Sequence, residues 1–181
     1  MKTGLVILLA CGCLAAPSVS IAKRAAMAAP AKLHCSGHGD AESMTLDEAE
    51  ATPLYAMLQG KLGDPTGCAL SRGGGNETFV VTFAKGATLT FVDNETLESA
   101  KEDVALPAGS ATVTRDDAVK VLKATERDDE PKGMGVNWAK LMAPVPAGDA
   151  DVVAEGKSCN AKAHVQYSGG AVVGFGFSSA C

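Results

Sequence analysis

The chain has 181 residues, 46% of them hydrophobic and 20% charged, and its formal net charge is −5 at pH 7. An acidic chain without a basic stripe is a poor ligand for nucleic acid or for an anionic membrane surface, so the charge argues against both kinds of partner. The length and the hydrophobic content are sufficient for one ordinary domain with its own core.

The first residues have the pattern of a secretory signal peptide. Lys2 precedes a short apolar run at residues 4–10, and small residues then lead to a small-x-small cleavage motif that ends at Ala22. The apolar run is too short to span a bilayer as a helix, and no later stretch is long enough to do so. We predict a signal peptide over residues 1–22; a second candidate cleavage site ends at Ala28.

The remainder of the chain divides into two parts. Residues 23–33 are rich in alanine and have no hydrophobic pattern, which predicts a flexible leader, and residues 34–181 are expected to form one domain. The alternative is lipoprotein processing at Cys11, because residues 8–11 are a loose version of a bacterial lipobox. The sequence thus predicts a periplasmic or secreted protein, with a lipid anchor at Cys11 as the alternative.

Cysteine usage agrees with export. The predicted signal peptide contains two of the six cysteines, and an even number then remains, which in an exported chain indicates disulfides. The remaining four cysteines allow three connectivities. Each of two pairs brackets a local segment, so the predicted disulfides are Cys35–Cys68 and Cys159–Cys181.

The best-specified structure lies at residues 77–94, where two strands of alternating polarity flank a short turn. Residues 84–86 are expected to form a three-residue loop, with Gly86 in the left-handed conformation that such loops require. A slip of one residue would move the apolar side chains to the polar face, so the register is well determined. The predicted pairs are Phe83 with Ala87, Val81 with Leu89, and Phe79 with Phe91.

The C-terminal residues predict a second hairpin of the same kind, with a three-residue loop at 168–170. A two-residue loop at Gly169 and Gly170 would instead set His164 and Gln166 beside apolar residues, which buries polar groups for no gain. The predicted apolar face comprises Ala161, Ala163, Val165, Tyr167, Ala171, Val173, Phe175 and Phe177.

Two segments have helical patterns with recognisable ends. Thr52 is expected to cap the first helix, and Gly63 ends it. Thr114 is expected to cap the second helix, whose first turn is acidic and whose last turn reaches about Asp128.

The links between these elements have weaker patterns. Residues 63–75 are expected to form a turn-rich link, and residues 95–107 fit either a helix or a short strand. We predict an α+β fold in which two helices pack on one face of an antiparallel sheet of four to five strands, stapled by the two disulfides.

Two histidines at the start of the domain suggest a metal site. His34 and His38 flank Cys35, and imidazole and thiolate are good ligands for zinc or copper. A four-residue spacing brings two histidines together only on a helix, whereas Gly37 and Gly39 argue for a loop. We therefore expect an exposed disulfide loop with no metal and no other cofactor, and the site at His34 and His38 is the alternative.

His164 is the remaining histidine, on the outer face of the last hairpin beside Lys162 and Gln166. A general base needs a nucleophile within reach. The sequence has no Gly-x-Ser-x-Gly motif, and no thiol remains once the cysteines pair. We therefore predict no catalytic residue, with chemistry at His164 as the alternative.

The sole tryptophan supplies a candidate contact with a partner. Trp138 lies with Met134 in a segment that contains glycines, and an aromatic side chain on an irregular segment can anchor a partner protein. The competing interpretation is that Trp138 closes the end of a small core.

The predicted function follows from size, disulfides, charge and the lack of an assembled catalytic set. We predict an exported, non-enzymatic binding protein, in the form of an inhibitor or immunity-type partner of another envelope or secreted protein. Its acidic charge would steer it toward a basic target. The alternative class is a metal-binding or hydrolytic envelope protein that uses His34, His38 or His164.

Overall fold

The structure of the protein, a computed structural model, describes residues 36–37, 52–73, 75–94, 99–110, 112–129 and 133–181. Several predictions fall outside the described residues and stay predictions. They concern the signal peptide at 1–22, the leader at 23–33, the lipidation site Cys11, and the residues His34, Cys35 and His38.

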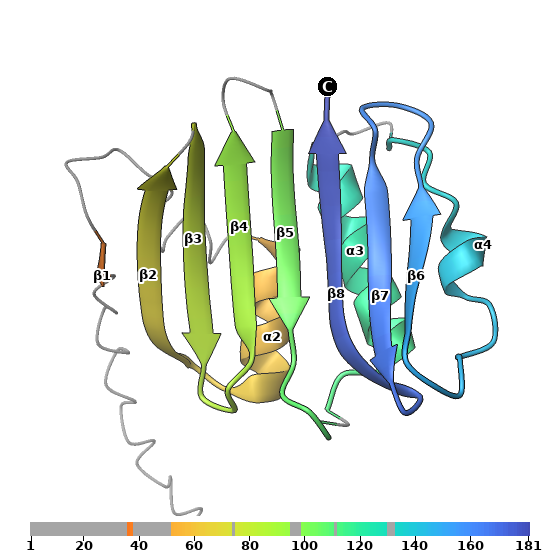
Figure 1. Cartoon of the computed structure of the whole chain (residues 1–181), viewed down its shortest axis with the longest axis horizontal. Coiled ribbons are helices and arrows are strands. Elements are labelled where there is room, and N and C mark those ends of the chain that lie inside the picture. Colours follow the sequence, from red (N-terminus) through yellow and green to blue (C-terminus); the bar gives the residue numbers. More distant parts are fainter. Residues whose placement is uncertain (1–35, 38–51, 74, 95–98, 111, 130–132) are drawn as a thin grey trace, which may run out of the picture. The chain divides into compact units, whose positions relative to one another are not determined.

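The described residues form one sheet in the strand order β1-β2-β3-β4-β5-β8-β7-β6 (Figure 1). Strands β2 to β8 pair antiparallel throughout, and β1 adds a short parallel pairing to β2. The strands are β1 Ser36–Gly37, β2 Pro65–Gly73, β3 Asn76–Phe83, β4 Thr88–Asn94, β5 Ser99–Ala105, β6 Ala150–Glu155, β7 Lys162–Ser168 and β8 Ala171–Ala180.

The helices of the described residues are α2 Pro53–Leu62, α3 Arg115–Asp129 and α4 Trp138–Leu141. Helices α2 and α3 lie on the same face of the sheet, and α4 lies beside the edge strand β6 (Figure 1). Helix α2 precedes the strands β2 to β5, whereas α3 and α4 precede β6 to β8, and the two halves join where β5 pairs with β8. The sheet therefore has a covered face and an open face, which no described helix covers.

Side chains that alternate along the strands fill the space between the sheet and the helices. In β8, Phe175 and Phe177 are 0% and 2% exposed. Burying such a side chain contributes about 1.5–3 kcal/mol. The other largest buried side chains are Leu54, Tyr55, Leu58, Leu62, Val81, Phe83, Leu89, Leu122, Leu141 and Val165.

The predicted sheet of four to five strands with two helices and two disulfides is wrong. The described residues form seven antiparallel strands, three short helices and one disulfide. That disulfide is the predicted Cys159–Cys181 bridge, which is confirmed. The other predicted pair includes Cys35, which lies outside the described residues; Cys68 is buried on β2.

The additional strands have weak patterns of their own. Strand β2 occupies most of residues 63–75, which we predicted to be a link. The prediction is wrong because only Cys68 and Leu70 of this strand alternate toward the core, which is too weak a pattern to indicate a strand. Charged residues interrupt the apolar pattern of β5 and β6. These strands are specified by their neighbours in the sheet more than by their own composition.

The first predicted hairpin, β3–β4, is confirmed in its register. Val81 pairs with Leu89 and Phe79 with Phe91. The ring centroids of the two phenylalanines are 6.1 Å apart. Gly86 has a φ of 81°, as the predicted loop requires.

The second hairpin, β7–β8, forms with a different loop from the one predicted. Its turn is the two-residue Gly169–Gly170, with φ values of 56° and 80°. A register shift between Gln166 and Tyr167 then restores the apolar pairing, so that Val165 lies opposite Phe175. The expected three-residue loop is wrong because a bulge absorbs the extra residue and keeps the polar side chains off the core.

The N-terminus of α3 is a capping box that also links the two long helices. The amide and hydroxyl of Thr114 donate to Asp117 Oδ2 at 3.0 and 2.6 Å, and Asp117 N–H donates to Thr114 Oγ1 at 3.2 Å. Lys61 Nζ of α2 lies 2.8 Å from the same carboxylate oxygen. The cap predicted at Thr114 is confirmed, as is the one at Thr52, whose Oγ1 accepts from Tyr55 N–H at 3.2 Å.

A buried carboxylate fixes the loop that follows α3. Glu126 is 6% exposed. Its Oε1 accepts from the N–H groups of Met134 and Val136 at 2.9 and 3.2 Å, and its Oε2 accepts from Trp138 Nε1 at 3.1 Å. One side chain therefore satisfies three N–H groups, and through them it positions α4.

We expect Glu126→Gln to lower the free energy of unfolding by roughly 1–3 kcal/mol. The NH₂ group of glutamine would replace an oxygen that accepts a hydrogen bond, so a buried N–H group would lose its acceptor. Denaturant unfolding followed by the fluorescence of Trp138 measures the change. Glu155→Gln, at an exposed position of β6, is the control, and its effect should stay within about 0.5 kcal/mol. Equal stability of the two variants would contradict the assigned role of Glu126.

The hydrogen bond from Lys61 and those from Thr114 lower the pKa of Asp117 from 3.8 to about 2. A carboxyl group with a depressed pKa stabilises the fold above its unfolded pKa, and the contribution disappears as the pH falls through the folded value. We expect Asp117→Asn to be less stable than the unmodified protein by about 1–2 kcal/mol at neutral pH, with the difference closing as the pH falls from 3.8 toward 2.

Thermal unfolding across this pH range tests the prediction. Asp116→Asn is the matched control, since that side chain is 71% exposed and should give a small difference without such a pH dependence. A constant gap for Asp117→Asn at all pH values would rule out the assigned charge effect.

Candidate functional site

Strand β8 carries little side-chain volume on the open face of the sheet. Its alternation places Phe175 and Phe177 in the core, and it places Gly174, Gly176 and Ser178 on the opposite face. The neighbouring strands β5 and β7 carry full side chains at the same level. Two hollows on the open face border β8 and its neighbours, and we call the region that they form the β8 groove.

The β8 groove contains two hollows of about 410 and 360 Å³. Lys101, Lys162 and Ser178 line both hollows, so the hollows adjoin at this row of residues. The side chains that line the larger hollow are mostly polar and include Thr90, Lys101, Asp103, Asp151, Lys162, His164, Gln166 and Ser178.

The two glycines allow side chains of the flanking strands to lean across β8. A Cβ atom on Gly176 would lie 2.8 Å from His164 Cε1 and would collide with Asp103 Oδ1. A Cβ atom on Gly174 would lie 2.7 Å from Gln166 Oε1. Both positions therefore require glycine, because side chains of the flanking strands cover them closely.

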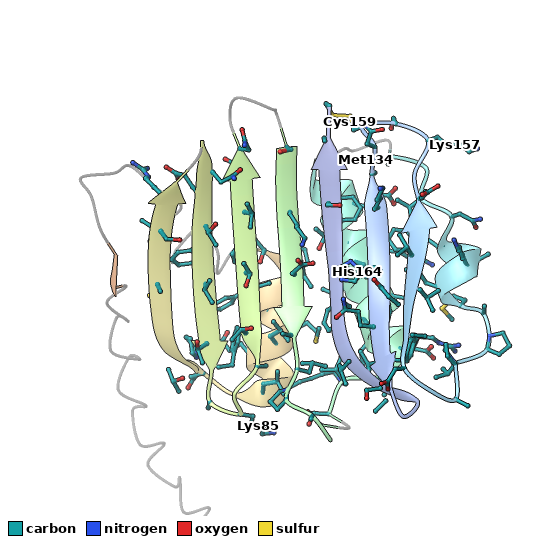
Figure 2. The ribbon with its side chains drawn as sticks, in the orientation of Figure 1. Lys85, Met134, Lys157, Cys159 and His164 are labelled. Atoms are coloured by element: carbon teal, nitrogen blue, oxygen red, sulfur yellow. A yellow bond between two sulfur atoms is a disulfide. The ribbon has the colours of Figure 1, made fainter. Side chains whose placement is uncertain are left out.

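His164 and Asp103 face one another above Gly176, from β7 and β5. His164 Nε2 lies 3.6 Å from Asp103 Oδ1, and the two side chains are 20% and 29% exposed. Figure 2 shows His164 near the middle of β7 and β8. Asp103 Oδ1 is buried and has no hydrogen-bond partner within the described part of the chain. The other oxygen, Oδ2, forms an ion pair with Lys101.

This arrangement can present hydrogen-bond donors and acceptors to a bound group. A separation of 3.6 Å is longer than a hydrogen bond, so Asp103 does not hold the imidazole of His164 in a fixed orientation. The hydroxyl of Ser178 lines the same hollow, but no hydrogen bond joins it to His164 in the described residues. The described side chains therefore do not form the hydrogen-bonded arrangement of a catalytic triad.

The structure places the predicted partner-binding residues away from the groove. Met134 is buried, at 5% exposure, and Trp138 is partly buried against the core. The indole of Trp138 donates to Glu126, and Lys123 Nζ lies 5.7 Å from its ring centroid. Figure 2 shows Met134 near one end of the sheet, away from His164. The prediction that Met134 and Trp138 contact a partner stays a prediction.

Two further searches concern metals and membranes. Within the described ranges, no group of three or more His, Cys, Asp or Glu side chains is placed to hold a metal ion. The described helices include none of the length and apolarity needed to cross a membrane.

Most residues of the β8 groove were missed at the level of the sequence. His164 was singled out there, whereas Lys101 and Asp103 lie in the segment whose structure was left open. The signal that could have revealed the groove is the Gly-Phe-Gly-Phe repeat at residues 174–177. In a strand, this repeat makes one face apolar and leaves the other bare.

No protein-family model matches the chain, and no curated protein or solved structure matches it. The function of the groove is therefore argued from its geometry alone.

The need for glycine at position 176 can be tested by stability. We expect Gly176→Ala to destabilise the protein by roughly 1–3 kcal/mol, because the new methyl group would also lie 2.5 Å from the backbone oxygen of Glu102. Gly60→Ala is the control, since this helical position has open space around it. It should stabilise by about 0.4–1 kcal/mol. Denaturant unfolding that gave both variants the same sign would contradict the close packing over Gly176.

Proposed function

We propose that the protein is an exported, non-enzymatic binding protein that recognises another envelope or secreted protein through the β8 groove. The observation that carries the proposal is the groove itself, which is lined by polar side chains from five strands. A sheet face that has no helix over it and carries a central depression suits a partner with a protruding loop. An inhibitor or immunity-type partner is the form of the proposal that we favour.

The charges of the groove support recognition of a protein surface. Both signs are present on the open face, with Lys101 and Lys162 at one level and Asp103 and Asp151 elsewhere in the larger hollow. Mixed charge on a partly exposed surface favours specificity through complementary charges over tight binding of one small ion. The net charge of −5 adds long-range attraction toward a basic target.

Capture of the partner tests the proposal. The oxidised protein is immobilised and exposed to envelope and secreted fractions of its source organism, and the retained proteins are quantified by mass spectrometry. We expect one stoichiometric partner. Ser178→Trp, which fills the row shared by the two hollows, should reduce its capture at least about tenfold, which corresponds to a loss of about 1.4 kcal/mol.

The matched control is Ser71→Trp, which makes the same change on the open face of β2. Position 71 lies four strands from β8, or roughly 19 Å at the usual strand spacing. This variant should retain the partner. Equal capture by the two tryptophan variants would show that the β8 groove is not the binding site, and repeated absence of any partner, with reversible crosslinking, would count against a binding protein.

A second candidate function is hydrolysis through His164, favoured by the carboxylate of Asp103 at 3.6 Å from its imidazole. The nucleophile would be a water molecule or the hydroxyl of Ser178, which lines the same hollow. Assays of ester, peptide and glycoside hydrolysis, with His164→Ala as the blank, separate this function from binding. Metal analysis of protein purified without chelator or affinity tag, with a His34→Ala/His38→Ala double variant, tests the metal-binding alternative.

A further inference from the structure

One row of the β8 groove gathers hydrogen-bond donors from three adjacent strands. Lys101 of β5 and Lys162 of β7 are the direct cross-strand neighbours of Ser178 on β8. All three side chains lie on the open face and line both hollows. Two ammonium groups and a hydroxyl thus border the point where the hollows meet.

The two lysines differ in how far their charges are already neutralised. Lys101 forms an ion pair with Asp103. The ammonium group of Lys101 can donate three hydrogen bonds, and this ion pair occupies part of that capacity. Among the described residues, no carboxylate lies within ion-pair distance of Lys162. Glu155 is its cross-strand neighbour on β6, but Glu155 lines neither hollow. The row therefore keeps unused ammonium donors on its groove side, chiefly those of Lys162.

We infer that this row, Lys101–Ser178–Lys162, receives a carboxylate of an Asp or Glu side chain on the partner protein. This assignment rests on the proposed function and adds the chemistry of the contact. A carboxylate has two oxygens and can accept from two ammonium groups and a hydroxyl at once, and such charge-assisted hydrogen bonds are stronger than neutral ones. Docking of the partner would exclude water from the row and strengthen them further.

The shape of the groove favours a side chain on a protein over a small free anion. Pockets for small molecules enclose most of the surface of their ligand. Here the two hollows are open depressions that continue one another along the length of β8. A polypeptide loop can follow such a groove. The row of donors lies where the two hollows meet, and a side chain at the tip of the partner's loop would enter there.

A titration followed by nitrogen–proton correlation NMR tests the inference. The probes are the blocked tripeptide acetyl-Gly-Glu-Gly-amide and its neutral match, acetyl-Gly-Gln-Gly-amide. We expect saturable shifts at the amides of Lys101, Lys162 and Ser178 with the Glu peptide, with a dissociation constant in the millimolar range, and little response to the Gln peptide. Lys162→Met should weaken binding about tenfold. Lys120→Met, at an exposed position of α3, should leave it unchanged.

Three outcomes would overturn the inference: equal shifts with both peptides, no saturable shift at the three residues, or binding of acetate or inorganic phosphate as tight as that of the Glu peptide. The last outcome would make the row a site for free anions. Capture of the partner by two variants distinguishes a failure of this inference from a failure of the proposed function. If Ser178→Trp loses the partner and Lys162→Met retains it undiminished, the groove binds the partner but the carboxylate contact is wrong. If both variants retain the partner, the proposed function itself fails.

Discussion

Strand β8 must carry large apolar side chains on one face and almost no side chains on the other, and the neighbouring elements pack against both faces. On the covered face, Phe175 and Phe177 are almost fully buried and pack the centre of the core. On the open face, Gly174 and Gly176 leave room for side chains from β5 and β7. Each glycine within a strand costs roughly 0.5–1 kcal/mol, whereas each buried phenylalanine contributes about 1.5–3 kcal/mol. The core therefore stabilises a strand that its glycines alone would weaken.

The same strand joins the two halves of the sheet, so the groove lies at their junction. Its walls come from both halves, with Lys101 and Asp103 on β5 and with Lys162 and His164 on β7. Behind the sheet, an ion pair between Asp117 of α3 and Lys61 of α2 also joins the two halves. The β5–β8 and β7–β8 pairings thus set the spacing of the polar groups on the open face.

The sequence predicted the local structure well where one strand pair carries its own pattern. The β3–β4 register follows from alternating Phe79, Val81 and their partners, and the helix caps follow from Thr52 and Thr114. Pairing between strands that are far apart in the sequence produces no such local pattern. The pairing of β5 with β8 joins residues that are far apart in the chain, such as Val104 and Phe175, which are 71 positions apart. The charged strand β5 has no apolar pattern that would indicate this pairing. The strand count was therefore underestimated.

The candidate site escaped prediction for the same reason. His164 could be placed on an outer face, but its position opposite Asp103 depends on the β5–β8 pairing and on the bulge near Gln166. Trp138, the first residue of α4, is a second case in which a long-range contact decides the role of a side chain. Trp138 donates to a buried carboxylate twelve residues earlier, Glu126. This bond gives the sole tryptophan a structural role, whatever it contacts outside the chain.

The form of the His164–Asp103 pair bears on what kind of function the groove can support. A catalytic imidazole is normally held by a hydrogen-bonded carboxylate, which fixes its orientation and tautomer. Here Asp103 is turned partly toward Lys101, and its Oδ1 stays 3.6 Å from the imidazole. The carboxylate is therefore paired with Lys101 and does not hold the imidazole of His164 through a hydrogen bond. The His164–Asp103 pair therefore lacks the hydrogen bond that orients the imidazole in a catalytic triad.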